Sequence, residues 1–295
     1  RIRSRPFGVV PAPDETPAAI FVMALDTRPL ATDPRHALEG AEADFERGLD
    51  ALARLTAGPV FLCQDRGSDI APARRRDGRL RIVKCAPVHP WGMAGFQVHR
   101  HFPATAARPV WDIAAQDVAA IGALLESGLV PETRLVSVAG PALHDGRLVR
   151  CQPGADLRAL CYGHARPGPY TILSGSALDG QAARWLRLRD RQVTAIGPVE
   201  AQRRGHWFLS ALHRAARPLP LIPTAALEQA LGGEMPAIPF LRSLAAGDAE
   251  TAARLGALSL LPEDLALADY VSCAEPALSK LLDGMLRGLS AGEAA

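Results

Sequence analysis

Every residue from Ala19 to Leu25 is apolar, and this run constrains the fold more than any other feature of the sequence. A strand with one solvated face alternates apolar and polar residues, whereas a strand buried on both faces is apolar throughout. Strands of the second kind occur in parallel sheets that carry helices on both faces. The run ends at a turn-forming sequence, Asp26-Thr27-Arg28-Pro29. We therefore expect a central strand over residues 19–25, followed by a turn.

Strand-like and helix-like segments alternate after this run, up to about residue 130. Further strands are predicted at residues 59–63 and 80–85, and helical spacing of apolar residues marks 37–55 and 117–127. Gly128 follows the second helix, and glycine commonly ends helices. This alternation predicts an α/β domain over residues 1–130, with a parallel sheet covered by helices.

The pattern changes at about residue 131, where glycine- and proline-containing turns separate short strands. Strands are predicted at residues 134–139, 147–151 and 170–173, and one short helix at 156–162. Strands around a single helix favour a small α+β unit of the β-grasp kind over residues 131–200.

The chain after residue 201 contains no convincing strand. Apolar residues recur there at helical spacing, in segments 223–231, 238–246, 249–255 and 276–289. Asp248 precedes the third segment and is a good N-cap. Glu263 and Asp264 are typical of the first turn of a helix. We therefore predict a helical domain over residues 201–295.

The net charge is +2 and acidic and basic residues are interspersed, so nothing indicates a nucleic-acid partner. Arg74 to Arg76 form a local cluster, which is typical of a solvated loop but can also contact a phosphate or a membrane surface. No segment reaches the ~18 apolar residues that span a bilayer. No signal peptide is recognised either. We expect a soluble, cytoplasmic chain, and its first residue, Arg1, indicates a fragment.

Motifs for nucleotide or metal chemistry are missing from the sequence. Neither G-x-G-x-x-G nor G-x-x-x-x-G-K-[ST] occurs, and no two of the five cysteines form a C-x-x-C pair. His99 and His101 would share one face of a strand and could hold a metal, although surface or core-edge histidines are the simpler interpretation. The glycine turns at 92–95 and 175–180 could approach a ligand or be plain turns. We predict no catalytic residue and no metal site.

A colinear series of segments resembles the A subunit of the Na+-translocating NADH:quinone reductases. The series includes residues 5–7, continues with the strand and turn at residues 20–34, and ends at residues 263–267. The matching segments between them are 44–49, 89–95, 110–111, 116–118, 120–122, 140, 147–150, 172–176, 247–248 and 255–258. The chain departs from the family pattern at Met23, commonly Asn, and at Gln97, usually His. The family's Cys-Pro-Gly-Lys is reduced here to Cys273-Ala274-Glu275-Pro276, and its amino-terminal lipoyl-like β domain does not precede Arg1.

The resemblance implies a Rossmann-like domain without a phosphate loop, followed by a β-grasp domain of the soluble-ligand-binding type and a helical domain. In flavin-binding relatives, the flavoprotein subunit of respiratory complex I and the C subunit of the Rnf complex, an acidic turn follows the first strand beside the flavin. The equivalent turn here carries a cation in place of one carboxylate, and its residues are Met23, Asp26, Arg28 and Pro29. The resemblance therefore implies a chain without a cofactor. NADH, flavins and an iron–sulfur centre would belong to partner subunits.

For function, the resemblance implies a non-catalytic peripheral subunit on the cytoplasmic face of the bacterial inner membrane. Such a protein docks on the membrane-embedded B subunit, helps to form the quinone (ubiquinone) site and serves Na+ transport. The segment 88–101 mixes apolar and polar side chains, as a quinone site or a subunit interface requires. Its candidate residues are His89, Trp91, Gly92, Met93, Gly95, Phe96 and His99. Packing of this loop against the β-grasp domain is the simpler alternative.

Three other functions stay open from the sequence. The chain could be a stand-alone binding module that holds a small ligand or a partner in its β-grasp domain. It could be an electron-transport protein like the C subunit of the Rnf complex. It could also be a flavin or nucleotide enzyme whose phosphate loop does not match the known motifs.

Overall fold

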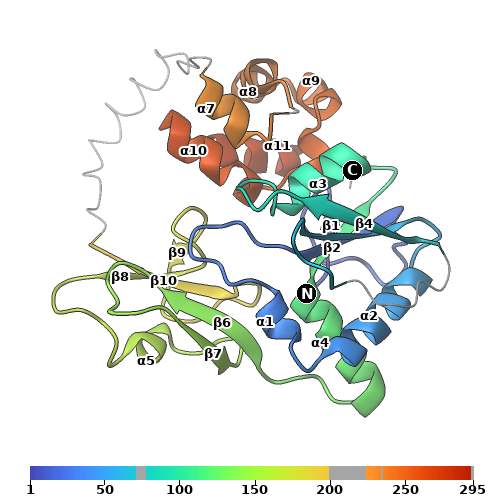
Figure 1. Cartoon of the computed structure of the whole chain (residues 1–295). Helices are drawn as coiled ribbons and strands as arrows, with labels where there is room; N and C mark the ends of the chain where they lie inside the picture. The colour runs from blue at the N-terminus through green and yellow to red at the C-terminus, as the bar shows by residue number, and fades with distance from the viewer. Residues whose placement is uncertain (71–77, 199–223, 234, 294–295) are drawn as a thin grey trace.

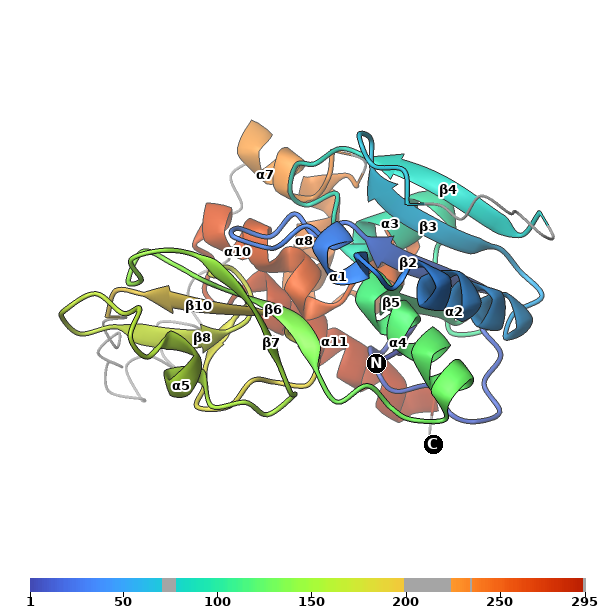
Figure 2. The ribbon, with the colours of Figure 1, turned by 60° about the horizontal axis from the view of Figure 1, so that its bottom comes forward.

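The computed structural model describes residues 1–70, 78–198, 224–233 and 235–293, which form three packed units. Figures 1 and 2 show a first sheet with its helices, a second sheet beside it, and a group of helices against the first unit. No helix within these ranges is both long enough and apolar enough to cross a membrane. The arginine cluster at 74–76 and the predicted domain boundary at residue 200 lie outside the described residues.

Five strands form the first sheet, in the order β1-β5-β2-β3-β4. Their bounds are β1 Arg3–Arg5, β2 Ala19–Ala24, β3 Val60–Asp65, β4 Leu80–Cys85 and β5 Val110–Ala114. β2 runs parallel to both neighbours, β3 and β5, and all six of its residues are buried, as its apolar sequence predicts. The chain builds outward from β2 to β4 and then returns to the other side of β2 as β5. The carboxyl ends of β2 and β5 therefore form a topological switch point, where open α/β sheets bind ligands.

Helices cover both faces of the first sheet (Figure 1). α2 (Glu42–Arg54) and α4 (Ala115–Ser127) pack on the face that carries Val22. α3 (Ala94–His101) packs on the face that carries Phe21. Because β2 presents side chains to a helical layer on either side, the sheet buries both faces, which is the condition that an uninterrupted apolar strand satisfies.

The predicted helix over residues 37–55 is divided into two. α1 spans Arg35–Leu38 and α2 begins at Glu42, and Gly40 lies between them with a φ of +74°. α2 and α4 pack very closely, since a Cβ at Gly122 would lie 1.8 Å from the carbonyl oxygen of Asp44. Gly128 ends α4 in the left-handed conformation, as predicted.

The second sheet has the order β7-β6-β10-β8-β9. Its strands are β6 Arg134–Ala139, β7 Arg147–Cys151, β8 Thr171–Ser174, β9 Gln181–Ala182 and β10 Gln192–Ile196. β6 and β10 are parallel and central, and the other pairs are antiparallel. One helix, α5 (Leu157–Cys161), packs on the sheet and is capped by the Asp156 carboxylate, which accepts the Arg158 N–H at 2.8 Å. The predicted strands are confirmed, whereas β9 and β10 were not predicted.

The helical unit follows, and its apolar core includes Met93 and Phe96 from the α3 region of the first unit. Its elements are α7 Ala225–Ala230, α8 Ala237–Ala246, α9 Ala249–Arg254, α10 Ala266–Ser272 and α11 Leu278–Glu293, with short 3-10 turns η1 Ala257–Ser259 and η2 Pro262–Leu265. Asp248 caps α9 by accepting the Thr251 N–H at 3.0 Å, as predicted. The first unit therefore contributes side chains to the core of the helical unit.

Candidate functional site

A cavity of about 750 Å³ lies where the three units meet, at the carboxyl ends of β2 and β5. The first unit contributes Met23, Leu25 and Ala114 to its lining, and the loop between β8 and β9 contributes Leu178. The helical unit closes the cavity with residues of η2 and α10 such as Pro262. A cavity of this volume at a switch point is the position at which this class of sheet binds small molecules.

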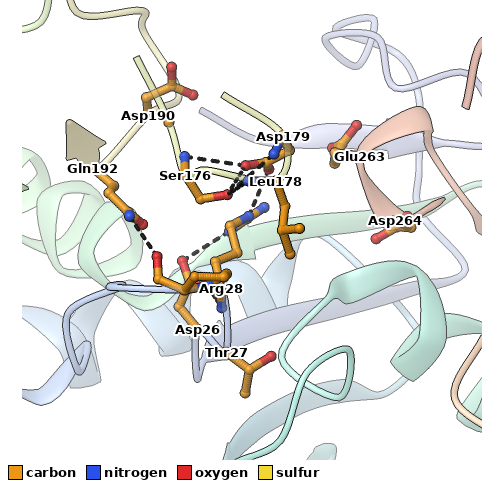
Figure 3. A network of polar contacts seen from close by, with 12 residues as sticks. Asp26, Thr27, Arg28, Ser176, Leu178, Asp179, Asp190, Gln192, Glu263 and Asp264 are labelled. Carbon is orange, nitrogen blue, oxygen red and sulfur yellow. Dashed lines mark hydrogen bonds and ion pairs between the residues drawn. The ribbon is translucent and has the colours of Figure 1, made fainter. Parts of the chain in front are cut away.

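The turn after β2 links the first unit to the second at this cavity (Figure 3). The Arg28 guanidinium donates through Nη1 to Asp26 Oδ2 at 2.9 Å and through Nε to Asp179 Oδ2 at 2.8 Å. The carbonyl oxygen of Pro29 accepts a hydrogen bond of 2.7 Å from Gln192 Nε2 on β10. Met23, Asp26 and Arg28 line the cavity, so three of the four predicted turn residues lie at it.

Asp179 is held in place by its own loop. Its Oδ1 accepts the Ser176 hydroxyl at 2.5 Å and the Ser176 N–H at 3.3 Å. The loop folds back tightly, because Gly175 has a φ of +104° and a Cβ there would lie 2.8 Å from the Cα of Gly180. The glycine turn at 175–180 therefore presents a fixed carboxylate to Arg28.

The electrostatics follow from this geometry. Burial opposes ionisation of Asp179, but Arg28 and the hydrogen bonds from Ser176 outweigh it and hold the pKa of the carboxyl below its usual value. Burial likewise opposes the charge on Arg28, yet Asp26 and Asp179 raise its pKa. Both groups are charged near neutral pH, and Arg28 forms an ion-paired clamp between the first and second units.

Thr27 connects the same turn to the segment that precedes α3. Its hydroxyl oxygen accepts the Gly92 N–H at 3.0 Å and lies 3.2 Å from His89 Nδ1. A Cβ at Gly92 would lie 2.6 Å from the Thr27 nitrogen, so the two segments touch through backbone. Burial, and then repulsion from Arg28, lower the pKa of His89. Gly92 also lines the cavity.

The remaining candidate residues of segment 88–101 contact the helical unit or lie beneath it. Met93 and Phe96 are buried in its core. Gly95 donates its N–H to Asp264 Oδ1 at 3.3 Å. His99 packs against Gly256 so closely that a Cβ on Gly256 would lie 2.2 Å from His99 Nδ1. Trp91 lies under the Arg100 guanidinium, 5.3 Å from the ring centroid. Of the seven predicted residues, the structure places Gly92 at the cavity and His89 against Thr27 of the turn after β2. The other five pack in α3 and the segment before it, and Met93, Gly95, Phe96 and His99 face the helical unit rather than the second sheet.

The prediction that His99 and His101 share a strand face is wrong, because both lie on helix α3. An α-helix rotates by about 100° per residue, so side chains two positions apart point to nearly opposite sides of the helix. Within the described ranges, no three His, Cys, Asp or Glu side chains are grouped as a metal site requires.

A buried ion network, which no sequence pattern indicated, joins the amino-terminal strand to the helical unit. Arg5 is fully buried and donates to Asp112 Oδ1 and Asp264 Oδ2, each at 2.8 Å, and to the Ser259 carbonyl oxygen at 2.6 Å. Arg3 donates to Asp112 Oδ2 at 2.9 Å and pairs with Glu263. Burial alone would raise the pKa of Asp112, but the two arginines lower it to about 2.

Comparison with known proteins gives the family. The model "NqrA second alpha/beta domain" matches residues 1–130, and the model "NQRA C-terminal domain" matches residues 135–184. Proteins named as the A subunit of Na(+)-translocating NADH-quinone reductase, from Shewanella denitrificans and Actinobacillus pleuropneumoniae, are each 36% identical, over 92% and 91% of this chain. One from Alcanivorax borkumensis is 33% identical over 92% of it. The chain belongs to the NqrA family.

This NqrA-family chain spans 66% of the length of each of those three relatives. Among solved structures, a chain of an NAD+-reducing [NiFe]-hydrogenase superposes with a TM-score of 0.47 at 16% identity, over 92% of this chain and 57% of its own. That likeness is too distant to bear on function.

Two departures from the family pattern are accommodated within this structure. Met23 lines the cavity and is 9% exposed. Gln97 is buried in α3 and donates from Nε2 to the Trp91 carbonyl oxygen at 2.7 Å. Met23 thus lies at the switch point, and Gln97 is fixed within α3 by this hydrogen bond.

Proposed function

We propose that this chain is a non-catalytic peripheral subunit of a Na+-translocating NADH:quinone reductase, docked at the cytoplasmic face of the inner membrane on the membrane-embedded B subunit. The observation that carries the proposal is the match of both family models, in order, together with relatives named for the A subunit over 92% of the chain. Na+ transport and electron transfer are then properties of the whole complex.

We also propose the finer fold assignments. The doubly covered, mainly parallel first sheet with its switch point supports a Rossmann-like domain over residues 1–130. The mixed second sheet around one helix, with a parallel central pair, supports a β-grasp domain over residues 131–200. The helices within 224–233 and 235–293 support a helical domain for the segment 201–295, whose remaining residues lie outside the described ranges.

The chain is proposed to hold no flavin. Arg28 replaces a carboxylate of the acidic flavin-site turn, and its guanidinium is engaged by Asp26 and Asp179. Met23 adds an apolar side chain to the same end of β2. NADH, flavins and an iron–sulfur centre are assigned to partner subunits.

The cavity at the switch point is the best candidate for a quinone contribution. A quinone ring needs apolar walls and one or two donors for its carbonyl oxygens. Met23, Leu25 and Leu178 supply apolar surface, and Arg28 supplies N–H donors through Nη2, which takes no part in its bonds to Asp26 and Asp179. Gly92 connects this site to the predicted segment 88–101, whose other candidate residues would position it through the helical unit.

Affinity purification from native membranes tests the assignment to the complex. A tagged chain is expected to co-purify with a polytopic membrane protein and flavin-containing partners, identified by mass spectrometry. Recovery of the chain alone from gently solubilised membranes would contradict the assignment and favour a stand-alone binding module. An absorption band of bound flavin near 450 nm in the chain purified without partners would contradict the absence of a cofactor.

Binding of a short-chain ubiquinone, measured by calorimetry on the purified chain, tests the cavity. Leu178→Trp would fill part of the cavity and should weaken binding by about tenfold or more, as expected for loss of ~1.4 kcal/mol. Leu125→Trp is the matched control, because Leu125 is exposed on α4 and lies outside the cavity lining. Equal affinities for the two variants would place the quinone elsewhere.

A further inference from the structure

One corner of the cavity carries an excess of positive charge. Arg1, Arg189 and Arg191 line it, and Arg134 lies beside them, with its Nη1 donating to the Leu188 carbonyl oxygen. A single buried carboxylate is shared in this corner: Asp117, which is 3% exposed, pairs with Arg191 and lies 3.5 Å from Arg1 Nε. Asp112 and Glu263 also attract Arg189, but these two carboxylates already pair with Arg3 and Arg5, so the corner keeps a net positive charge.

Several of these cations lack acceptors in the described part of the chain. Arg134 is 4% exposed, and its Nε and Nη2 are buried without a hydrogen-bond partner there. Nε of Arg191 is also buried without a hydrogen-bond partner there. Arg189 makes no hydrogen bond or ion pair within the described residues, although it lines the cavity. Burying a charged donor without an acceptor costs free energy, so such donors usually face a water, an ion or a ligand.

The pKa directions agree with this geometry. Burial lowers the pKa of Arg134; attraction by Asp117 opposes this shift, and repulsion from Arg191 and Arg1 reinforces it. Burial, and then repulsion from Arg3, lower the pKa of Arg189. Each guanidinium would be stabilised by a further negative charge in this corner.

The amino terminus of α4 opens on the same corner. Ala114, Ala115 and Gln116 line the cavity, and Ala114 at the N-cap position offers no side-chain acceptor for the first N–H groups. α4 is thirteen residues long, so its amino terminus carries the partial positive charge of a full helix, which Asp117 in the first turn offsets in part. A helix amino terminus at the end of a parallel strand is a favourable place for an oxyanion.

We propose that this corner binds an oxyanion, the phosphate or carboxylate group of a small molecule. Arg189 and the first turn of α4 contact the oxyanion, and Arg134 and Arg191 supply the surrounding charge. Arg28 and the apolar walls lie in another part of the lining, formed by the turn after β2 and the β8–β9 loop. The inference does not rest on the proposed quinone function, because quinones are neutral and oxyanion binding can be measured without them.

Isothermal titration of the purified chain with inorganic phosphate and, separately, with succinate tests the proposal and distinguishes the two oxyanions. Measurements are made against chloride at matched ionic strength, since screening alone changes surface electrostatics. We expect saturable binding of one of the two anions. Arg189→Gln should weaken it about tenfold, and Arg189→Lys less, because lysine keeps the charge but not the bidentate donors.

Arg158→Gln is the matched control, since Arg158 is an exposed arginine on α5 of the same unit and lies outside the cavity lining. Circular dichroism and thermal midpoints without anion establish that each variant folds, and Arg189→Lys provides the readout should Arg189→Gln not fold. Binding no stronger than that of chloride would overturn the proposal. Equal affinities for wild type, Arg189→Gln and Arg158→Gln would overturn it as well.

Discussion

Replacement of Arg28 by methionine removes the clamp between the first two units while keeping a long side chain. Arg28 makes two charge-assisted hydrogen bonds, to Asp26 and Asp179, and the three side chains are 15–27% exposed. Such bonds contribute about 1.5–3 kcal/mol each when buried. Because the three side chains are partly exposed and both carboxylates stay partly solvated, the two bonds together stabilise the fold by less than twice this amount. We expect the free energy of unfolding at pH 7 to fall by about 2 kcal/mol.

The pH dependence sharpens this test. Arg28 holds the pKa of Asp179 below its ordinary value of 3.8. A depressed carboxyl pKa contributes stability above the unfolded-state pKa, and this stability is lost as the pH falls through the folded-state pKa. The difference in the free energy of unfolding between wild type and Arg28→Met should therefore be largest near neutral pH and shrink as the pH falls below about 3.8.

Urea titration followed by tryptophan fluorescence and circular dichroism measures this difference. The matched control is Arg35→Met, because Arg35 pairs with Asp33 on the exposed side of the adjacent α1 and should affect stability little. Equal losses in the two variants would refute the clamp. A loss for Arg28→Met that is independent of pH would show that Asp179 is not the partner that matters.

Three further substitutions have definite expectations, each measured by urea titration. Arg5→Met should cost about 3–5 kcal/mol, because it leaves Asp264 buried without its cation, and a loss below about 1 kcal/mol would refute the role of the network. Gly122→Ala should cost about 1–3 kcal/mol, because its Cβ would collide with the Asp44 carbonyl oxygen and push α2 from α4. Gly284→Ala on α11 meets no atom within 4 Å and should stabilise by about 0.5–1 kcal/mol. If Gly122→Ala and Gly284→Ala changed the free energy of unfolding in the same direction, close packing of α2 on α4 would not be the cause of the change at Gly122.

Local patterns in the sequence were sufficient to predict the elements that bury their side chains in a regular way. β2 was predictable because both of its faces are covered, which makes the whole strand apolar. β6 and β7 matched their predicted bounds, since turn residues define both ends of each strand. The capping of α9 by Asp248 was predictable for the same reason, because the cap is made within one turn of the helix.

Elements whose residues are satisfied by distant partners were missed. β5 contains Asp112, which interrupts its apolar pattern and is buried only because β1 brings arginines to it. α3 follows glycines and carries alternating histidines, so it resembled a loop and a strand. β10 did show the alternation of a half-buried strand, in Gln192 and Thr194 against Val193, and that signal could have identified it.

The candidate site was predictable in part. The unusual turn after β2 was identified, and Met23, Asp26 and Arg28 do lie at the cavity. Its second wall comes from a loop about 150 residues further on, where Asp179 pairs with Arg28 across a separation of 151 positions. No periodicity or spacing within one segment can encode such a pairing, so the clamp, the cavity and its arginine-rich corner required the three-dimensional structure.

Photoaffinity labelling of the chain within its membrane complex tests the proposed function most directly. An azido-ubiquinone is photolysed with the purified complex, and the labelled peptides of this chain are identified by mass spectrometry. We expect labels on the segments that line the cavity, 23–28 and 175–181, with competition by unlabelled ubiquinone and loss of labelling in Leu178→Trp but not in Leu125→Trp. Competable labelling confined to other segments, or a membrane complex that contains no copy of this chain, would contradict the proposal.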